Sequence, residues 1–324
     1  MQRHYYAQVT EAKLTHHNCC KCKLDELFFD LDTSGAQNRM TSSVVEKRSL
    51  KTSLGDIVYL DWNRNSKLSP IICIHGVNRN KHDFDYLAAG LVKNGFRVIA
   101  LDMLGRGESS YMDRELYTYQ TYKVIMLEFI ERLNLSRFSL VGTSMGGIIS
   151  MMVAADMPGY IGTLIINDIG PYTDKSAMLT LSKYLCMYPE FEHLAEAEKF
   201  LRVLFKPLNL SEEEHWQHMI NSSMRRKENG KYVLNFDPEI FRGHKEKITG
   251  SRDLWKVWES IDNSIPILVL RGELSRMLSK ETLIQMVQLR PNASYIEYPG
   301  IGHAPSLFGD NQIKDVISWL TKNN

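Results

Sequence analysis

The residues with the clearest chemical potential lie in the stretch LVGTSMGG at 140–147. An apolar run leads into Gly142-Thr143-Ser144-Met145-Gly146, and an apolar helical pattern follows at once. G-x-S-x-G between a strand and a helix is typical of a nucleophile elbow, in which a strained backbone pushes the serine hydroxyl out of the sheet. The flanking positions must be glycine because strand and helix approach too closely for a Cβ. The motif predicts Ser144 as a nucleophile; the alternative is a chance glycine-rich turn.

A serine nucleophile needs a base within hydrogen-bond reach of its hydroxyl. In chains with this elbow the order is serine, acid, histidine, so the base comes late. YPGIGHAP at 298–305 supplies His303, the only histidine after His244. We therefore expect His303 to be the base, with a structural histidine as the alternative.

The oxyanion formed by serine attack needs two donors. IHGVN at 74–78 ends a strand with a His-Gly turn, which predicts the backbone N–H of Val77 as one donor. The N–H of Met145, next after the nucleophile, is the other. His75 is interpreted as a residue that shapes the loop.

These groups must be held by the elements around them. Short β-branched or aromatic runs predict strands at 55–62, 70–76, 96–102, 138–144, 163–168, 266–272 and 294–300. Helical patterns lie between them at 83–95, 118–134, 146–157 and 311–320. Strands alternating with helices, several of them apolar throughout, favour an α/β fold with a doubly wound, mostly parallel sheet.

The alternation stops between the strands that end at Asp168 and start at Pro266. Residues 170–262 are too long for an unstructured loop and have a mainly helical pattern, so we expect a lid over the carboxyl ends of the strands. Residues 43–169 and 263–324 would form the core. Residues 1–42, which lack periodicity, are expected to be a flexible extension.

Composition limits the possible partners. The 39 Lys and Arg residues balance 38 Asp and Glu residues, which argues against nucleic acid and favours a small molecule. No apolar run could span a membrane, and the first twenty residues lack the apolar core of a signal peptide. Five cysteines, three of them at 19, 20 and 22, do not form a disulfide pattern, so a cytoplasmic location is expected.

Metals and cofactors have little support in the sequence. HHNCCKC at 16–22 offers soft ligands without a second cluster, and Glu214 with His218 is one isolated i, i+4 pair. No G-x-G-x-x-G follows an early strand. We expect no metal and no cofactor.

Taken together, HG at 75–76, the elbow at 142–146 and GIGH at 300–303 resemble the α/β-hydrolase family. DMLGRGES at 102–109 is similar to a structural turn of that family. The likeness runs from about residue 43 to the end and is nearest to lidded bacterial serine hydrolases. It implies that fold, with the lid between the strands that count as sixth and seventh in the family, here 163–168 and 266–272, but no particular substrate.

This chain differs from the family at the position of the expected catalytic acid. In those relatives the loop after the strand 266–272 reads R-G-x-x-S-D, whereas this chain has Arg276 in place of the aspartate. A cation about 5 Å from the imidazole would oppose its protonation by ~3 kcal/mol, so Arg276 should point away or be paired. Asp168, at the end of the strand 163–168, is the preferred acid, because some relatives take the acid from that strand. Glu273 is the second candidate, and the third possibility is that no acid functions.

The sequence thus predicts a serine hydrolase that cleaves a small or medium apolar carboxylic ester. A ligand-binding pseudoenzyme is the competing hypothesis, and a C–C hydrolase or acyltransferase could use the same groups. The oligomeric state is not indicated.

Overall fold

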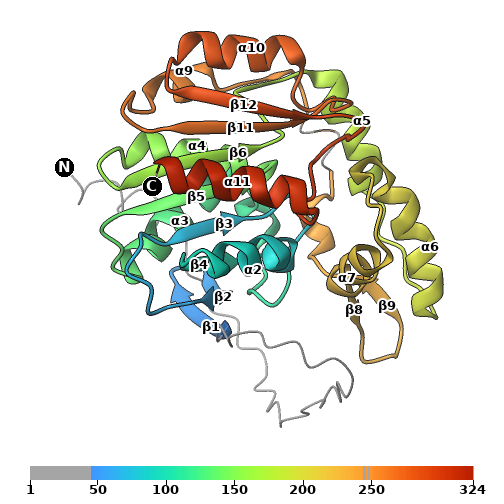
Figure 1. Cartoon of the computed structure of the whole chain (residues 1–324). Helices are drawn as coiled ribbons and strands as arrows, with labels where there is room; N and C mark the ends of the chain where they lie inside the picture. The colour runs from blue at the N-terminus through green and yellow to red at the C-terminus, as the bar shows by residue number, and fades with distance from the viewer. Residues whose placement is uncertain (1–44, 244–245, 247, 324) are drawn as a thin grey trace. The chain divides into compact units, whose positions relative to one another are not determined.

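The computed structural model describes residues 45–243, 246 and 248–323. Within this part of the chain, eight strands form one sheet in the order β1-β2-β4-β3-β5-β6-β11-β12 (Figure 1). β1 and β4 flank β2 antiparallel, and all later neighbours are parallel. The strands are β1 (Val45–Thr52), β2 (Gly55–Trp62), β3 (Ile71–Ile74), β4 (Val98–Leu101), β5 (Phe138–Thr143), β6 (Ile161–Asn167), β11 (Ile267–Gly272) and β12 (Ala293–Tyr298).

Helices cover both faces of this sheet. α2 packs with α11 on one face, while α3 and α9 pack with α4 on the other, where α10 also contributes (Figure 1). The bounds are α2 (Asp85–Lys93), α3 (Tyr119–Arg132), α4 (Met145–Asp156), α9 (Trp255–Ser260), α10 (Lys280–Leu289) and α11 (Asp310–Asn323), with 3₁₀ turns η2 (Lys81–Phe84) and η3 (Arg114–Leu116).

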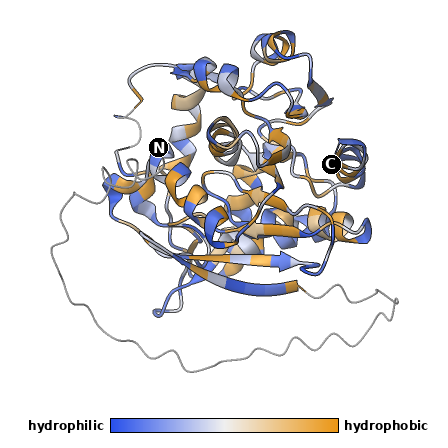
Figure 2. Cartoon of the chain, turned by 90° about the vertical axis from the view of Figure 1, so that its left-hand side faces the viewer, coloured by the Kyte–Doolittle hydropathy of each residue, from blue (hydrophilic) through white to orange (hydrophobic). Residues whose placement is uncertain are grey.

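Two hydrophobic cores result, one on each face of the sheet. Successive residues of β3 alternate between them: Ile72 and Ile74 join the core under α3 and α4, whereas Ile71 and Cys73 join the core under α2 and α11. Figure 2 shows hydrophobic residues concentrated on the strands and on the helix turns beside them. A strand buried on both faces needs apolar residues at every position, as these runs have.

The doubly wound, mostly parallel sheet expected from the sequence is confirmed. All the expected strands and helices are present, with ends shifted by a few residues. β1 was not expected, because the edge strand VEKRSLKT is rich in charged residues, three of them consecutive at 46–48, and has no apolar run. Its pairing with β2 comes from a tight turn at Ser53 and Leu54, between Thr52 and Gly55.

The inserted segment, residues 170–262, lies between β6 and β11. Figure 1 shows α5, α6 and α7 beside the right-hand end of the sheet. Most of its apolar side chains form a cluster separate from the two sheet cores, whereas Trp258 of α9 joins the core beside α4. Its other elements are β7 (Tyr172–Thr173), α5 (Lys175–Leu185), α6 (Leu194–Leu204), η4 (Lys206–Leu208), α7 (Glu213–Ser223), β8 (Met224–Arg226), β9 (Tyr232–Leu234), η5 (Pro238–Ile240) and β10 (Arg252–Asp253).

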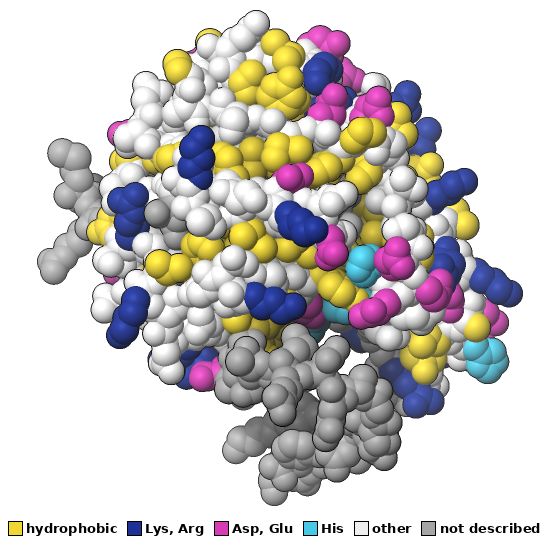
Figure 3. Space-filling model, in the orientation of Figure 1, with side chains coloured by type: hydrophobic (Ala, Val, Ile, Leu, Met, Phe, Trp, Pro, Cys, Tyr) yellow, Lys and Arg dark blue, Asp and Glu magenta, His cyan; other side chains and the backbone are white. Residues whose placement is uncertain are grey.

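The expected extension at 1–42, with HHNCCKC, falls outside the described residues. Among the described helices, none combines the length and apolarity that a bilayer crossing requires. On the face drawn in Figure 3, basic side chains are scattered and do not form one patch. That distribution agrees with the near-zero net charge of +1.

Candidate active site

Ser144 occupies a strained turn between β5 and α4, with φ 53° and ψ −111°. Non-glycine residues rarely adopt these backbone angles, because they are strained. The strained conformation persists because the surrounding packing stabilises it. A Cβ on Gly142 would lie 2.3 Å from the Gly146 carbonyl oxygen, and one on Gly146 would lie 1.9 Å from the Ile74 carbonyl oxygen. The two glycines therefore allow helix, turn and neighbouring strand to touch. Ser144 is itself mostly buried, at 8% exposure.

His303 lies between the serine and a carboxylate. Its Nε2 is 2.8 Å from Ser144 Oγ, and its Nδ1 is 2.8 Å from Asp168 Oδ2. An ionised carboxylate only accepts, so Nδ1 carries the proton and Nε2 accepts from the serine hydroxyl. This tautomer lets the imidazole take the serine proton. The structure thus brings together Ser144, His303 and the preferred acid.

Asp168 owes its position to the pairing of β6 with β11. It follows the last residue of β6, has φ 58°, and donates its backbone N–H to the Leu270 carbonyl at 2.8 Å. Its second carboxylate oxygen, Oδ1, accepts the Gly272 N–H at 3.0 Å. Both oxygens of this fully buried group therefore have partners. Aspartate tolerates a left-handed backbone better than most residues, which suits it to this turn.

Glu273, the second acid candidate, is turned to another partner. Its Oε2 accepts the Gly300 N–H at 2.8 Å, and the residue is exposed. Arg276 is exposed as well and lines the cavity beside Ser144. Arg276 was expected to point away from the imidazole or to be paired, and within the described residues its guanidinium makes no hydrogen bond or ion pair. Solvent therefore screens its charge.

Two backbone N–H groups were predicted to hold the oxyanion. Met145 begins α4, so its N–H has no intrahelical acceptor. Val77 lies in the loop after β3 and lines the same cavity as Ser144.

Buried Arg106 connects these two residues. Its Nε donates to the Val77 carbonyl at 2.9 Å, and its Nη2 lies 3.5 Å from Met145 Sδ. Sequence reasoning missed Arg106, although DMLGRGES was recognised as a turn. An arginine flanked by glycines in a loop looks solvent-exposed, and only the fold reveals its partners.

His75 connects the loop after β3 to neighbouring backbone through both ring nitrogens. Nδ1 donates to the Gly76 carbonyl at 2.7 Å, and Nε2 accepts the Met103 N–H at 3.0 Å. Because the ring is fully buried, its pKa falls from 6.5 to about 3. A neutral ring satisfies both contacts and needs no counter-ion.

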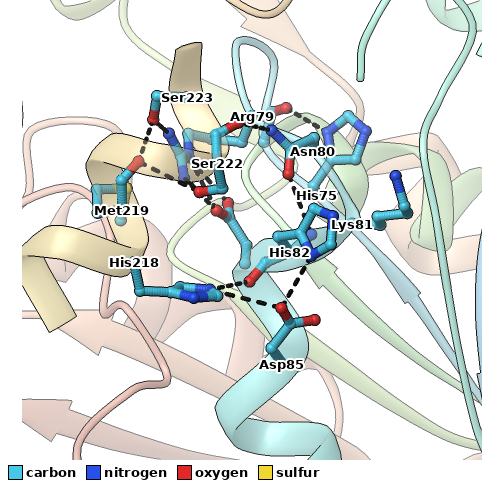
Figure 4. Close-up of polar contacts among 12 residues, drawn as sticks. His75, Arg79, Asn80, Lys81, His82, Asp85, His218, Met219, Ser222 and Ser223 are labelled. Carbon is cyan, nitrogen blue, oxygen red and sulfur yellow. Dashed lines mark hydrogen bonds and ion pairs between the residues drawn. The ribbon is translucent and has the colours of Figure 1, made fainter. Parts of the chain in front are cut away.

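The residues after Val77 are fixed to the inserted segment (Figure 4). Arg79 donates to Ser223, and Asn80 donates to the Ser222 carbonyl at 2.6 Å. His218 Nε2 lies 2.8 Å from the His82 carbonyl. The C-terminal half of α7 is therefore tied to the loop that carries a predicted oxyanion donor.

A cavity of about 720 Å³ opens over Ser144 and His303. That volume is in the usual range for small-molecule sites. From the inserted segment, Leu181, Tyr184 and Phe205 line it, whereas Trp216 and Trp255 do not. Trp216 packs against the separate cluster of the inserted segment, and Trp255 packs against the core beside α4.

The comparison with protein families agrees with this architecture. The model of the alpha/beta hydrolase fold family matches residues 69–310. The chain belongs to this family.

Relatives of this alpha/beta hydrolase support that assignment. A 3-hydroxybutyrate-oligomer hydrolase of Cupriavidus necator is 30% identical over 82% of this chain and 92% of its own length. An sn-1-specific diacylglycerol lipase of Danio rerio is 24% identical over 84% of this chain and 81% of its own.

Among solved structures, a putative hydrolase of Rickettsia typhi has a TM-score of 0.80 at 30% identity, and the match covers 87% of this chain and all of that one. An alpha/beta hydrolase of Novosphingobium aromaticivorans has a TM-score of 0.78 at 26% identity, with the same coverage.

The remaining candidates for metal binding have separate partners in this hydrolase. Glu214 accepts from the Tyr86 hydroxyl at 3.2 Å, whereas His218 meets the His82 carbonyl. The described residues contain no group of three or more His, Cys, Asp or Glu arranged for a metal ion. Cys73 and Cys186 are free thiols, the first of them buried. Cys19, Cys20 and Cys22 lie outside the described residues.

Proposed function

We propose that this alpha/beta hydrolase is a serine ester hydrolase acting on small or medium apolar carboxylic esters. The observation that carries the proposal is the unbroken series of hydrogen bonds from Asp168 through His303 to Ser144, at the floor of a cavity. Such a series is the arrangement that activates a serine hydroxyl.

In the first half of the reaction, Ser144 Oγ attacks the ester carbonyl carbon while its proton passes to His303 Nε2. The N–H groups of Val77 and Met145 stabilise the negative oxygen of the tetrahedral intermediate. The bond to the alkoxy oxygen then breaks, and His303 gives the proton to the departing alcohol. Asp168 stabilises the imidazolium in between.

In the second half, water attacks the acyl group on Ser144. His303 takes a proton from this water and returns it to the serine oxygen as the acid departs. One ester and one water thus give one acid and one alcohol.

The inserted segment would act as a lid in this reaction. Its residues Leu181, Phe205 and Leu208 contribute apolar surface to the cavity. Covering the ester in this way excludes bulk water and strengthens the contacts to the oxyanion.

The names of the relatives favour esters. Two of them are named for hydrolysis of a hydroxybutyrate oligomer and of a diacylglycerol. The pseudoenzyme alternative rested on the arginine at 276, and the contact between Asp168 and His303 weakens it. Free thiols at 73 and 186 favour the cytoplasm as the compartment of action.

Treatment with a fluorophosphonate probe and assay with 4-nitrophenyl butyrate test the proposal. The wild type should be labelled and release 4-nitrophenol, whereas Ser144→Ala should do neither. Ser150→Ala, which changes a buried serine of α4 outside the cavity, is the matched control. An unlabelled wild type would remove the hydrolase proposal. Labelling of the wild type without ester turnover would instead favour C–C hydrolysis or acyl transfer as the reaction.

A further inference from the structure

The cavity has an uneven distribution of charge. Besides His303, its charged lining residues are Arg79, Lys206, Arg276 and Asp83. Arg79 and Asp83 neutralise each other, since Arg79 Nη2 lies 2.6 Å from Asp83 Oδ1. Figure 4 shows Arg79 turned toward Ser222 and Ser223, and its guanidinium also lies 4.9 Å from the centre of the Phe205 ring. Arg79 is therefore already engaged.

Lys206 and Arg276 have no such partners. Both are exposed, and within the described residues neither side chain makes a hydrogen bond or an ion pair. The cavity thus holds two uncompensated positive charges. An apolar neutral ester would gain nothing from them, whereas a carboxylate would.

Both cations stand on the histidine side of the cavity. Arg276 belongs to the loop after β11, in which the Leu274 N–H donates to the Ile301 carbonyl at 2.8 Å. Lys206 begins η4, and the Gly302 N–H donates to the carbonyl of the next residue, Pro207, at 2.7 Å. Each loop is therefore fixed to the segment directly before His303.

In the proposed reaction, the departing alcohol would lie on that same side. His303 Nε2 must hand its proton to the alkoxy oxygen, so the alcohol part of the ester extends past the imidazole. The oxyanion donors belong to the loop after β3 and to the start of α4 instead. On this placement, a charge at the far end of the alcohol part would lie on the side of the cavity that Lys206 and Arg276 line.

Apolar residues accompany the cations. Tyr184, Val203 and Leu274 are exposed large hydrophobic residues, and all three line this cavity. They suit the aliphatic remainder of a substrate with one charged end.

We propose that the ester cleaved here is an alkanoyl ester of a hydroxycarboxylic acid, whose free carboxylate is bound by Arg276 and Lys206. The inference rests on the proposed ester hydrolysis and specifies its substrate. The acyl–oxygen bond breaks, the acyl group passes to Ser144 and then to water, and the alkoxide leaves as the hydroxy acid with a proton from His303. No co-reactant other than water is required.

The test compares 3-butyryloxybutanoate with its neutral counterpart 3-butyryloxybutanamide, by chromatography of the released hydroxy compounds. The wild type should have the higher kcat/KM for the acid. Arg276→Gln should lower the acid-to-amide ratio by up to about fivefold, the upper range for an exposed ion pair. Arg276→Gln combined with Lys206→Gln should lower it further. Raised ionic strength should also reduce the wild-type ratio.

Lys183→Gln is the matched control, because Lys183 is an exposed cation of α5 that does not line the cavity. A ratio that is near one in the wild type, or unchanged in the double variant, would overturn the inference while leaving ester hydrolysis intact. Inactivity on both esters, together with an unlabelled Ser144, would instead remove the proposed function and the inference with it.

A second substrate pair tests whether the bound carboxylate belongs to the alcohol part or to the acyl part of the ester. 4-Nitrophenyl hydrogen succinate carries its carboxylate on the acyl part. Its methyl ester is the neutral counterpart. The ratio for this pair should change less in Arg276→Gln than the ratio for the first pair. A larger change would contradict the placement of the carboxylate on the alcohol part.

Discussion

The ends of β6 and β11 lie side by side but carry opposite charges. β6 runs into Asp168, which contacts His303, whereas the loop after β11 presents Arg276 to the cavity. The strands pair in parallel, with Asn167 opposite Leu270. Two neighbouring parallel strands end at the same edge of a sheet, so either end can reach the same imidazole. β11 contributes a backbone donor to the Asp168 carboxylate, through Gly272.

This difference indicates that the position of an acid and its role are separable. Once the carboxylate stands at the end of β6, the loop after β11 no longer needs one. A side chain of the opposite charge can then face the substrate. In the proposed reaction, the loop after β11 would therefore contact the ligand instead of orienting the base.

The largest expected effect is at Asp168. Asp168→Asn should lower kcat for 4-nitrophenyl butyrate by about 10³- to 10⁴-fold, because the amide no longer fixes the histidine tautomer. Steady-state kinetics would measure the loss, and thermal unfolding would show whether the fold is kept. Near-wild-type turnover would mean that the end of β6 does not supply the acid.

Moving the carboxylate from the end of β6 to the loop after β11 tests whether either position can orient His303. Adding Arg276→Asp to Asp168→Asn should recover about tenfold or more of the lost turnover, because an acid at either end can orient the base. Arg276→Asn in the same background controls for loss of the cation. Equal rates in the two double variants would show that the end of β11 cannot replace the end of β6.

The end of β3 offers a contrast, because its histidine is structural. The pKa of His75 is about 3 in the folded chain but near 6.5 when unfolded, so only the unfolded chain takes up this proton between those values. The neutral His75 ring therefore contributes its full share to the free energy of unfolding above pH 6.5. Below pH 6.5 this share is lost by up to about 1.4 kcal/mol for each pH unit.

Urea unfolding between pH 6.5 and 4.5 should therefore show a steeper fall in the wild type than in His75→Asn. Because other groups titrate in this range, the difference between the two slopes is the quantity to compare. Parallel slopes would contradict the neutral buried ring.

The smallest effect is expected at Glu273, three residues before Arg276. Glu273→Gln should change turnover by less than about twofold, since an exposed residue away from special features contributes little. Its carboxylate contacts the Gly300 N–H and not His303. A loss comparable to that of Asp168→Asn would reverse the assignment of the two strand ends.

Much of this architecture could be predicted from local patterns. Glycines at 142 and 146 and the apolar run before them are sufficient to predict a strand, a strained serine and a helix. β-branched runs identified the buried strands, because a strand covered on both faces has a simple composition.

The identity of the acid could be ranked but not decided. It depends on the register that puts Asn167 opposite Leu270, and register is set by packing across 103 residues of chain. The role of Arg106 could not be predicted either, because it depends on a contact with Val77, 29 positions earlier in the chain. Local composition does not report such long-range contacts.

The inserted segment was the least predictable part. The hairpin of β8 with β9 breaks its helical pattern, and Tyr232 of this hairpin also pairs with Phe191, far earlier in the chain. Among its aromatic residues, Phe205 faces the cavity while Trp258 supports α4. Composition alone does not separate these two uses of an aromatic side chain.

The Gly272 N–H that holds Asp168 has an evolutionary consequence, because it belongs to the main chain. A change of side chain at 273 or 276 leaves this donor in place, and only proline at 272 would delete it. The loop after β11 can therefore drift in sequence, and in the chemistry it offers to ligands, while the acid keeps its orientation. New specificities could arise there without a loss of turnover along the way.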